Sequence, residues 1–295
     1  MRIAGIDFGD ERVTAVTVDE SGTIAARWHM SSRTEDLAST ARDAYQAITA
    51  AGGCDVLGVT LPFHADAVPA EISRELNTQH GRELVALNGG QAIALAEAWS
   101  GGAIGCRNVV AFSIGDHVTA GVLLDGRVLT GHNGHAASVA WLALNPVERE
   151  DYRRYGGLEA EVAAVGIVRR LVWRIKSGDQ SRVIEGVDGD LSRLTAADVF
   201  AAARAGDGVC LSVVRDTAKY VGMALANLAT VVDPECIVLS GTLATSGDLM
   251  LDAIRTECSR RLRPAQADNV SIVLGTLGDE AAAIGAARAA MLRRQ

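Results

Sequence analysis

Three glycine-containing turns in this sequence have the composition of phosphate-binding loops. Each follows a short apolar segment and carries glycine beside small polar or acidic residues. Glycine lets backbone N–H groups approach a phosphate without obstruction from a side chain. The candidate nucleotide-binding residues in the three turns are Asp7, Gly9, Ser113, Gly115, Gly241 and Thr242. Each turn alone has an ordinary composition, but two of them on facing domains could hold the phosphates of a nucleotide between them.

The elements that must position these turns occur twice in the same order. A strand, an acidic turn, a strand, a turn and a strand follow one another at about 5–28 and again at 108–130. Helical patterns at 34–52, 67–78 and 90–100 and strands at 55–61 and 83–87 lie between the copies. Helices dominate after the second copy, at 157–176, 195–204, 207–231, 247–262 and 279–293, with strands at 235–240 and 270–274.

This order predicts an α/β protein with two domains around a cleft. We expect a smaller domain at 1–105 and a larger one at 106–278, with the last helix, 279–295, packing back on the first. The length of 295 residues and the 48% content of hydrophobic residues suit two well-buried cores.

Charge and cysteine usage exclude several classes of protein. The net charge is −8 and the Arg clusters are short, whereas a nucleic-acid-binding protein needs clustered cations to displace phosphate counterions. Five scattered cysteines indicate a reducing compartment rather than a disulfide framework. The N-terminus has no signal-peptide pattern, and no apolar run reaches the roughly 18 residues of a membrane span. We expect a cytoplasmic protein that has no membrane partner and does not bind nucleic acid directly.

Segments from one end of the chain to the other share a family pattern. The strongest is Val232–Gly241, which continues into 247–255; the others are at 3–9, 92–97, 124–131, 157–160, 194–200 and 277–287. On these segments the chain resembles the ROK family (repressors, open reading frames and kinases), which includes bacterial glucokinases and N-acetylmannosamine kinases. The resemblance implies the actin-like ATPase fold, also called ribonuclease H-like, with a duplicated core. It also implies Mg-ATP, a sugar ligand and a homodimer formed through the larger domain.

The largest departure from the family lies at the start of the helix at 90–100. There the family reads Asn-Asp-Ala-Asn-Ala-Ala, and its Asp takes the proton from the sugar hydroxyl. This chain has Asn88 followed by Gly89, and the tail Ala94–Glu97 fixes the alignment. Since glycine accepts no proton, we assign no catalytic residue. Loss of a positioned general base typically lowers the rate about 10²–10⁴-fold. Asn88 fits a sugar contact and a helix cap equally well.

The phosphate turns also depart from the family pattern. The family reads Asp-x-Gly-Gly-Thr-Lys in the first turn, where this chain keeps Asp7 and Gly9 but adds Asp10 and Glu11. Carboxylates at this place repel a polyphosphate. In the second turn, Gly115 alone matches a family glycine and is followed by Asp116-His117. These two are not expected to pair, since neighbours on a strand point to opposite faces.

The sugar and zinc segments of the family are largely replaced. Ser138 stands where the family has a sugar-binding Glu, and Trp141 where it has a zinc-binding His, while Glu159 keeps the position of another sugar contact. Asn88, Ser138 and Glu159 are therefore our candidate sugar-binding residues. The stretch 151–159 lacks the family's cysteines, so we expect no zinc. The pair His132 and His135 has no evident third ligand, and we interpret it as loop polarity rather than as a metal site.

Three functions follow from this resemblance, and the sequence leaves open whether the protein is an enzyme. The first is a pseudokinase that binds a sugar or another small molecule, or regulates a partner. The second is an active ATP-dependent sugar kinase in which Asp10, Glu11 or Asp116 substitutes for the missing base. The third is a ROK-type transcriptional regulator, which we expect to lack its DNA-binding domain because the chain begins directly at the first strand.

Overall fold

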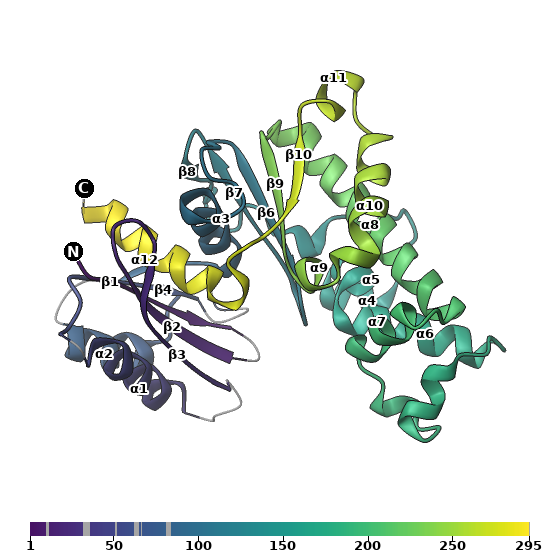
Figure 1. Ribbon diagram of the computed structural model, residues 1–295, viewed down its shortest axis with the longest axis horizontal. Helices are drawn as coiled ribbons and strands as arrows, with labels where there is room; N and C mark the ends of the chain where they lie inside the picture. Colours follow the sequence, from purple (N-terminus) through teal and green to yellow (C-terminus); the bar gives the residue numbers. More distant parts are fainter. Residues whose placement is uncertain are drawn as a thin grey trace.

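Two β-sheets lie side by side in the computed structural model, which describes residues 1–9, 12–31, 36–50, 52–61, 65, 67–80 and 84–294 (Figure 1). Asp10 and Glu11, which the sequence places in the first phosphate turn, lie outside the described residues. The helices flank both sheets, and the N- and C-termini lie near the same end of the molecule.

The first sheet has the strand order β3-β2-β1-β4-β5. Its strands are β1 (Ile3–Phe8), β2 (Arg12–Val18), β3 (Ile24–Ser31), β4 (Val56–Thr60) and β5 (Val85–Leu87). Helices α1 (Leu37–Thr49) and α2 (Ala70–His80) cover one face, and α12 (Ala281–Arg294) covers the other (Figure 1). Gly5 and Gly58 let α12 lie directly on the sheet, because a Cβ atom at either would be 1.9 Å from a carbonyl oxygen of α12.

The second sheet repeats the plan of the first, with the order β10-β9-β6-β7-β8. Its strands are β6 (Val109–Ile114), β7 (Val118–Leu124), β8 (Arg127–Val128), β9 (Cys236–Gly241) and β10 (Ser271–Leu274). In each sheet the first strand pairs antiparallel with the second and parallel with the fourth. The predicted internal repeat is therefore confirmed. Strand β8 is shorter than predicted, since the chain leaves the sheet after Val128.

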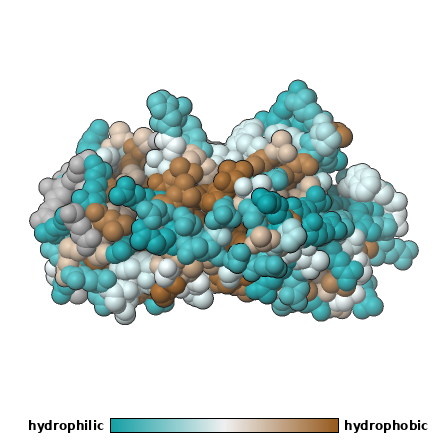
Figure 2. All heavy atoms as spheres, turned by 90° about the horizontal axis from the view of Figure 1, so that it is seen from above, coloured by the Kyte–Doolittle hydropathy of each residue, from teal (hydrophilic) through white to brown (hydrophobic). Residues whose placement is uncertain are grey.

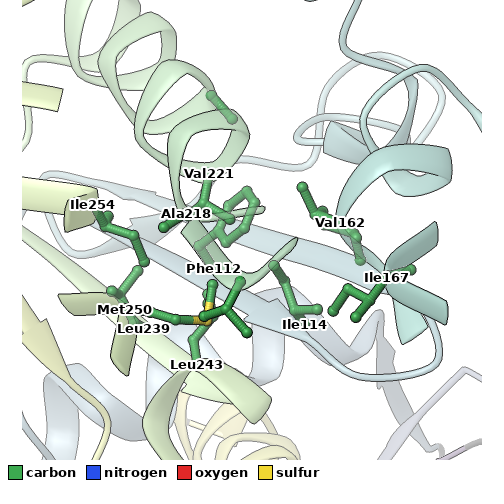
Figure 3. Close-up of a cluster of buried hydrophobic side chains, with 14 of the residues drawn as sticks. Phe112, Ile114, Val162, Ile167, Ala218, Val221, Leu239, Leu243, Met250 and Ile254 are labelled. Atoms are coloured by element: carbon green, nitrogen blue, oxygen red, sulfur yellow. The ribbon is translucent and has the colours of Figure 1, made fainter. Parts of the chain in front are cut away.

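Eight helices in the described residues cover the second sheet and extend beyond it. They are α4 (Glu150–Tyr155), α5 (Glu159–Val162), α6 (Ala164–Lys176), α7 (Ala196–Arg204), α8 (Gly208–Val232), α9 (Thr242–Thr245), α10 (Gly247–Ser259) and α11 (Pro264–Ala267). The main core lies beneath α8 and α10, where Phe112 and Ile114 of β6 meet Val221 and Ile254 (Figure 3). Ile114 is the last residue before the second phosphate turn, so this core anchors the turn.

The helix predicted at 157–176 is divided in two. Ala163 has an extended backbone, with ψ near 167°, and it separates α5 from α6. The N–H of Ala164 donates a hydrogen bond to the carbonyl of Gly115 at 3.2 Å. This hydrogen bond to the turn at Gly115 replaces the bond that the N–H of Ala164 would make within a continuous helix. The periodicity of the sequence does not reveal this break.

Helix α3 (Gly89–Ser100) lies at the junction of the two sheets. It packs on α12 and on β7, and Gly90 approaches the backbone of Ala120 so closely that a Cβ atom would lie 2.2 Å from its carbonyl oxygen. Seen from above, hydrophobic residues gather toward the middle of the molecule, between projecting hydrophilic segments (Figure 2). The domain boundary near residue 105 remains our proposal.

Candidate functional site

A cavity of about 320 Å³ opens at the N-terminus of α3, and we call it the α3 cavity. It brings together Gly89 and all three candidate sugar-binding residues, Asn88, Ser138 and Glu159. These come from separate parts of the chain: the first turn of α3, the loop after β8, and α5. The other lining residues are Leu61, Ala65, Val118, Thr119, Ala120, His135, Ala136, Ala137, Ala140, Trp141 and Tyr155.

Asn88 is a helix cap as well as a wall of the α3 cavity. Its side-chain oxygen accepts a hydrogen bond from the backbone N–H of Gln91 at 2.8 Å, and the Gln91 side chain accepts one from the N–H of Asn88. This reciprocal capping box fixes the start of α3. The cap and the cavity thus use the same residue, and a sugar contact by Asn88 remains a prediction.

Gly89 borders the cavity with unfilled space around it. A Cβ atom built at Gly89 would meet no heavy atom within 4 Å beyond its chain neighbours and its own helix. The position that carries the proton acceptor in family kinases is therefore open to a Cβ atom.

Glu159 is held by hydrogen bonds to both of its carboxylate oxygens. Only 3% of the residue is exposed. One oxygen accepts the backbone N–H of Val118 at 2.9 Å, and the other lies 3.0 Å from Nδ1 of His117. A carboxylate oxygen can accept more than one hydrogen bond, so a sugar contact by Glu159 also remains a prediction.

The loop after β8 carries Ser138 and a strained alanine. The Ser138 hydroxyl donates to the carbonyl of His135 at 2.7 Å, a hydrogen bond within the loop that lines the cavity. Ala137 next to it has φ of 62°, in the left-handed region that favours glycine.

Ala137→Gly should therefore stabilise the protein. The left-handed conformation costs a residue with a Cβ atom about 1–2 kcal/mol. Glycine avoids this cost, but it loses more conformational entropy on folding, which offsets part of the gain in stability. We expect a net gain of about 0.5–1 kcal/mol in the free energy of unfolding, measured by denaturant titration. The control is Ala143→Gly, which should lower the free energy of unfolding because Ala143 lies outside the left-handed region. A loss of stability in Ala137→Gly would contradict the inference that Ala137 is strained.

A second cavity, of about 870 Å³, lies beside α6, and we call it the α6 cavity. Gly115 and Thr242, two of the candidate nucleotide-binding residues, line it together with Asp116. Its wall on α6 is apolar and includes Val165, Val168 and Val172, and Ala196 and Ala197 of α7 add to it. A lining that combines this polar turn with apolar side chains suits the phosphates and the base of a nucleotide.

Ser113 and Gly241 lie next to each other at the adjoining ends of β6 and β9. Gly241 pairs with Ile114 in the sheet and has φ of 64°, and a Cβ atom there would lie 2.9 Å from the Ser113 hydroxyl. Only glycine fits this crossing. Four of the six candidate nucleotide-binding residues thus lie together at the carboxyl ends of β6 and β9 or directly after them.

Asp7 and Gly9, the other two candidates, lie at the corresponding end of β1 in the first sheet. The Thr60 hydroxyl donates to the Asp7 carboxylate at 2.6 Å and accepts the N–H of Phe8 at 2.9 Å. Beyond the turn, Arg12 forms an ion pair with Asp279 at 2.5 Å. Neither Asp7 nor Gly9 lines the α3 or the α6 cavity within the described residues, so their part in nucleotide binding stays a prediction.

Sequence reasoning missed several residues of the α3 cavity. Thr119, His135 and Tyr155 line it, but none stands at a family sugar-binding position. The sequence predicts only ordinary loop polarity for His135, and the fold of the loop brings it to the cavity. The exposed Trp141, which replaces the family's zinc-binding histidine, also lines the cavity, and 58% of it is accessible.

A larger cavity of about 910 Å³ between α6 and α8 is lined by several arginines. Its cations are paired with acids: Arg170 with Glu161 at 2.6 Å, and Lys219 with Asp216 at 3.1 Å. With these charges already matched, we place the candidate site at the α3 and α6 cavities instead.

In the described part of the chain, no three His, Cys, Asp or Glu side chains are grouped so that they could hold a metal ion. Burial raises the pKa of Cys236 to about 12 and those of Cys210 and Cys258 to about 11. These three thiols are therefore protonated at neutral pH. None of the described helices is both long and apolar enough to cross a membrane.

Comparison with known proteins supports the sequence resemblance. A glucokinase of Halalkalibacterium halodurans is 34% identical over 200 residues, which are 67% of this chain and 60% of that protein. A glucokinase of Streptomyces coelicolor is 27% identical over 96% of this chain and 95% of its own length. An N-acetylglucosamine repressor of Escherichia coli O157:H7 is 27% identical over 66% of this chain and 47% of its own length.

Solved structures of the same family share the fold. A ROK family glucokinase from Streptomyces griseus, in complex with glucose and AMPPNP, superposes with a TM-score of 0.82 over all of both chains, at 22% identity. A ROK family transcriptional regulator, a homologue of the E. coli MLC protein, gives a TM-score of 0.83 over 98% of this chain and 78% of its own, at 21% identity. The predicted actin-like ATPase fold is confirmed.

The family itself follows from a match along nearly the whole chain. The pattern of the ROK family covers residues 3–293, which include both sheets, both cavities and all three glycine-containing turns. The chain belongs to the ROK family, as a homologue of its sugar kinases and regulators.

Proposed function

We propose that this protein binds a monosaccharide in the α3 cavity and transfers phosphate to it from Mg-ATP only weakly. The observation that carries the proposal is the meeting of Asn88, Ser138 and Glu159 in one cavity with Gly89, which leaves the place of the family's proton acceptor empty. In this proposal the protein retains sugar binding, and its catalysis is impaired. The glucokinase relatives support the sugar as ligand.

The size and walls of the α3 cavity suit a monosaccharide. Its volume of about 320 Å³ falls at the small end of ligand sites, which range over about 300–1,000 Å³. Trp141 and Tyr155 offer flat apolar surfaces to the C–H face of a sugar ring, and the amide of Asn88 and the hydroxyls of Thr119 and Ser138 suit its hydroxyl groups.

The α6 cavity is the proposed nucleotide site. Gly115 and Thr242 lie where the phosphates would approach, and the valines of α6 supply a wall for the base. Asp116 is exposed at the same mouth, and its charge opposes a polyphosphate unless a divalent cation lies between them. We infer that Mg²⁺ accompanies the nucleotide.

The first test is calorimetric titration with glucose and other hexoses and amino sugars, with and without an unreactive ATP analogue, beside an assay of ADP release. We expect binding of at least one sugar and slow, sugar-dependent ADP release. A protein that binds no sugar would refute the proposal, whereas turnover at the usual rate of kinases, about 1–100 s⁻¹, would refute the impairment.

Trp141→Ala should weaken sugar binding while the protein stays folded. Aromatic contacts contribute about 0.5–1.5 kcal/mol beyond the area that they bury, so we expect affinity to fall by about 2–10-fold. The control is Trp173→Ala, since Trp173 is similarly exposed but lines the cavity between α6 and α8. An equal loss of affinity in both variants would place the sugar elsewhere.

A regulatory role is the second candidate, and the similarity to ROK repressors supports it. ROK repressors match this chain over about two thirds of its length, and a regulator structure superposes over 98% of it. In that case a sugar would change how the chain binds another protein, without turnover.

We also propose a homodimer, and a monomeric mass in light scattering would contradict it.

A further inference from the structure

Trp141 belongs to the lining of two neighbouring cavities. One is the α3 cavity, and the other has a volume of about 390 Å³ and is lined by residues at 143–148, 152–153 and 157. We call the second one the α4 cavity, because Tyr152 and Arg153 of α4 form part of its wall. Trp141 is 58% exposed. Since one exposed side chain borders both cavities, a ligand in the α3 cavity can extend over the Trp141 ring into the α4 cavity.

Backbone contacts fix Trp141 at this place. The carbonyl of Ala140, just before it, accepts the N–H of Leu158 at 3.0 Å, and the N–H of Trp141 donates to the carbonyl of Ser138 at 3.2 Å. A Cβ atom at Gly156 would lie 2.3 Å from the carbonyl oxygen of Ala140, so the two segments touch directly. The position of Trp141 between the cavities is therefore set by the fold rather than by the conformation of an isolated loop.

The lining of the α4 cavity suits a neutral ligand with an apolar face. Its charged residues in the described part of the chain are Glu148 and Arg153, and these two form an ion pair at 3.7 Å. The lining therefore has no excess charge to attract a phosphate or another anion. Pro146 and Val147 add apolar surface beside Trp141, and Val147 is 57% exposed. An aromatic ring and apolar side chains of this kind pack against the C–H face of a sugar ring.

Asn145 supplies a polar group in the α4 cavity. Its side-chain oxygen accepts the N–H of Val147 at 2.9 Å, which fixes the orientation of the amide. The amide nitrogen makes no hydrogen bond to the residues that the structure describes. Its two N–H groups can therefore donate to hydroxyl groups of a ligand.

We propose that the sugar ligand has at least two rings, one in the α3 cavity and the next in the α4 cavity, with the Trp141 side chain in contact with both. This rests on the sugar site proposed above for the α3 cavity and names its ligand more closely, as a disaccharide or a longer oligosaccharide. The α4 cavity is then a second sugar subsite, in which Asn145 donates hydrogen bonds to the second ring and Val147 packs against it.

The test is calorimetric titration of the full chain with maltose, cellobiose, lactose, trehalose and sucrose, and with the hexoses that compose them. We expect at least one disaccharide to bind about tenfold more tightly than either of its hexoses, because the second ring adds contacts with Trp141 and the α4 cavity. If hexoses bind and no disaccharide binds more tightly than its hexoses, the second subsite is overturned.

Two variants locate the second ring. Val147→Arg fills the α4 cavity with a long charged side chain, and Asn145→Asp removes the amide donors but keeps an oxygen for the N–H of Val147. Each should lower the affinity for the disaccharide by about threefold to tenfold and leave the affinity for the hexose unchanged. The control is Val231→Arg, which should change neither affinity, since Val231 is 85% exposed at the end of α8 and lines neither cavity.

The outcomes separate the second subsite from the function on which it rests. Unchanged disaccharide affinity in both Val147→Arg and Asn145→Asp would place the second ring elsewhere and overturn the inference, with the α3 site left standing. Equal losses for the disaccharide and the hexose would also overturn it, because a variant in the second subsite must act on the second ring alone. Failure of the natural chain to bind any hexose or disaccharide would overturn the proposed function itself.

Discussion

Gly89→Asp is expected to raise sugar-dependent ADP release by about 10²–10⁴-fold, the usual contribution of a positioned general base. The new side chain would enter open space at the mouth of the α3 cavity, because a Cβ atom at Gly89 has no neighbour within 4 Å. Gly89 is also the first residue of α3, where a carboxylate interacts favourably with the helix dipole. The substitution should therefore leave the free energy of unfolding unchanged or slightly increased.

The matched control for this gain is Gly89→Asn. Asparagine has the same shape as aspartate and also suits the start of a helix, but its amide does not accept the proton. We expect ADP release with Gly89→Asn to stay at the level of the natural chain. Equal gains in both variants would mean that filling the space, rather than supplying a base, limits turnover; no gain in either would mean that the nucleotide or the sugar is held out of line for transfer.

Glu97→Ala is expected to cause the largest loss of stability among these variants. Glu97 is fully buried in α3, and its carboxylate accepts backbone N–H groups from Gly102 at 2.7 Å and from Thr276 and Leu277 at 3.3 Å. Each buried N–H left without a partner costs about 1–3 kcal/mol. We therefore expect the free energy of unfolding to fall by about 3–5 kcal/mol, measured by denaturant titration.

Glu185→Ala is the control for this loss, because Glu185 is exposed in the larger half of the chain. Its free energy of unfolding should stay within about 0.5 kcal/mol of that of the natural chain. A loss below about 1 kcal/mol in Glu97→Ala would show that water replaces the carboxylate at this junction. The experiment thus measures how firmly α3, which carries Asn88 and Gly89, is tied to the segment that leads into α12.

The sequence by itself determined the fold class and the family. Strand patterns and tight turns recur at 5–28 and 108–130, and both copies fold into the same order of strands. Such patterns are readable because periodicity and turn chemistry act between residues close together in the chain. The absence of a carboxylate at position 89 was equally plain, since the helix that follows fixes the alignment.

The candidate site could be predicted only in part. The resemblance to the family points to Asn88, Ser138 and Glu159, and the fold brings them to one cavity. In the sequence, His117 stands beside Asp116, and neighbours on a strand point to opposite faces, so the sequence predicts no pair between these two. Its contact with Glu159 joins residues 42 positions apart, and no local pattern marks it.

Only the tertiary structure decided how the second phosphate turn meets α5 and α6. The break at Ala163 allows the N–H of Ala164 to donate a hydrogen bond to the carbonyl of Gly115. At the first residue of β7, the N–H of Val118 donates a hydrogen bond to the carboxylate of Glu159. Both are hydrogen bonds between distant segments. They form because buried backbone groups must find partners wherever the fold provides them, and that choice depends on packing in three dimensions rather than on the order of residues along the chain.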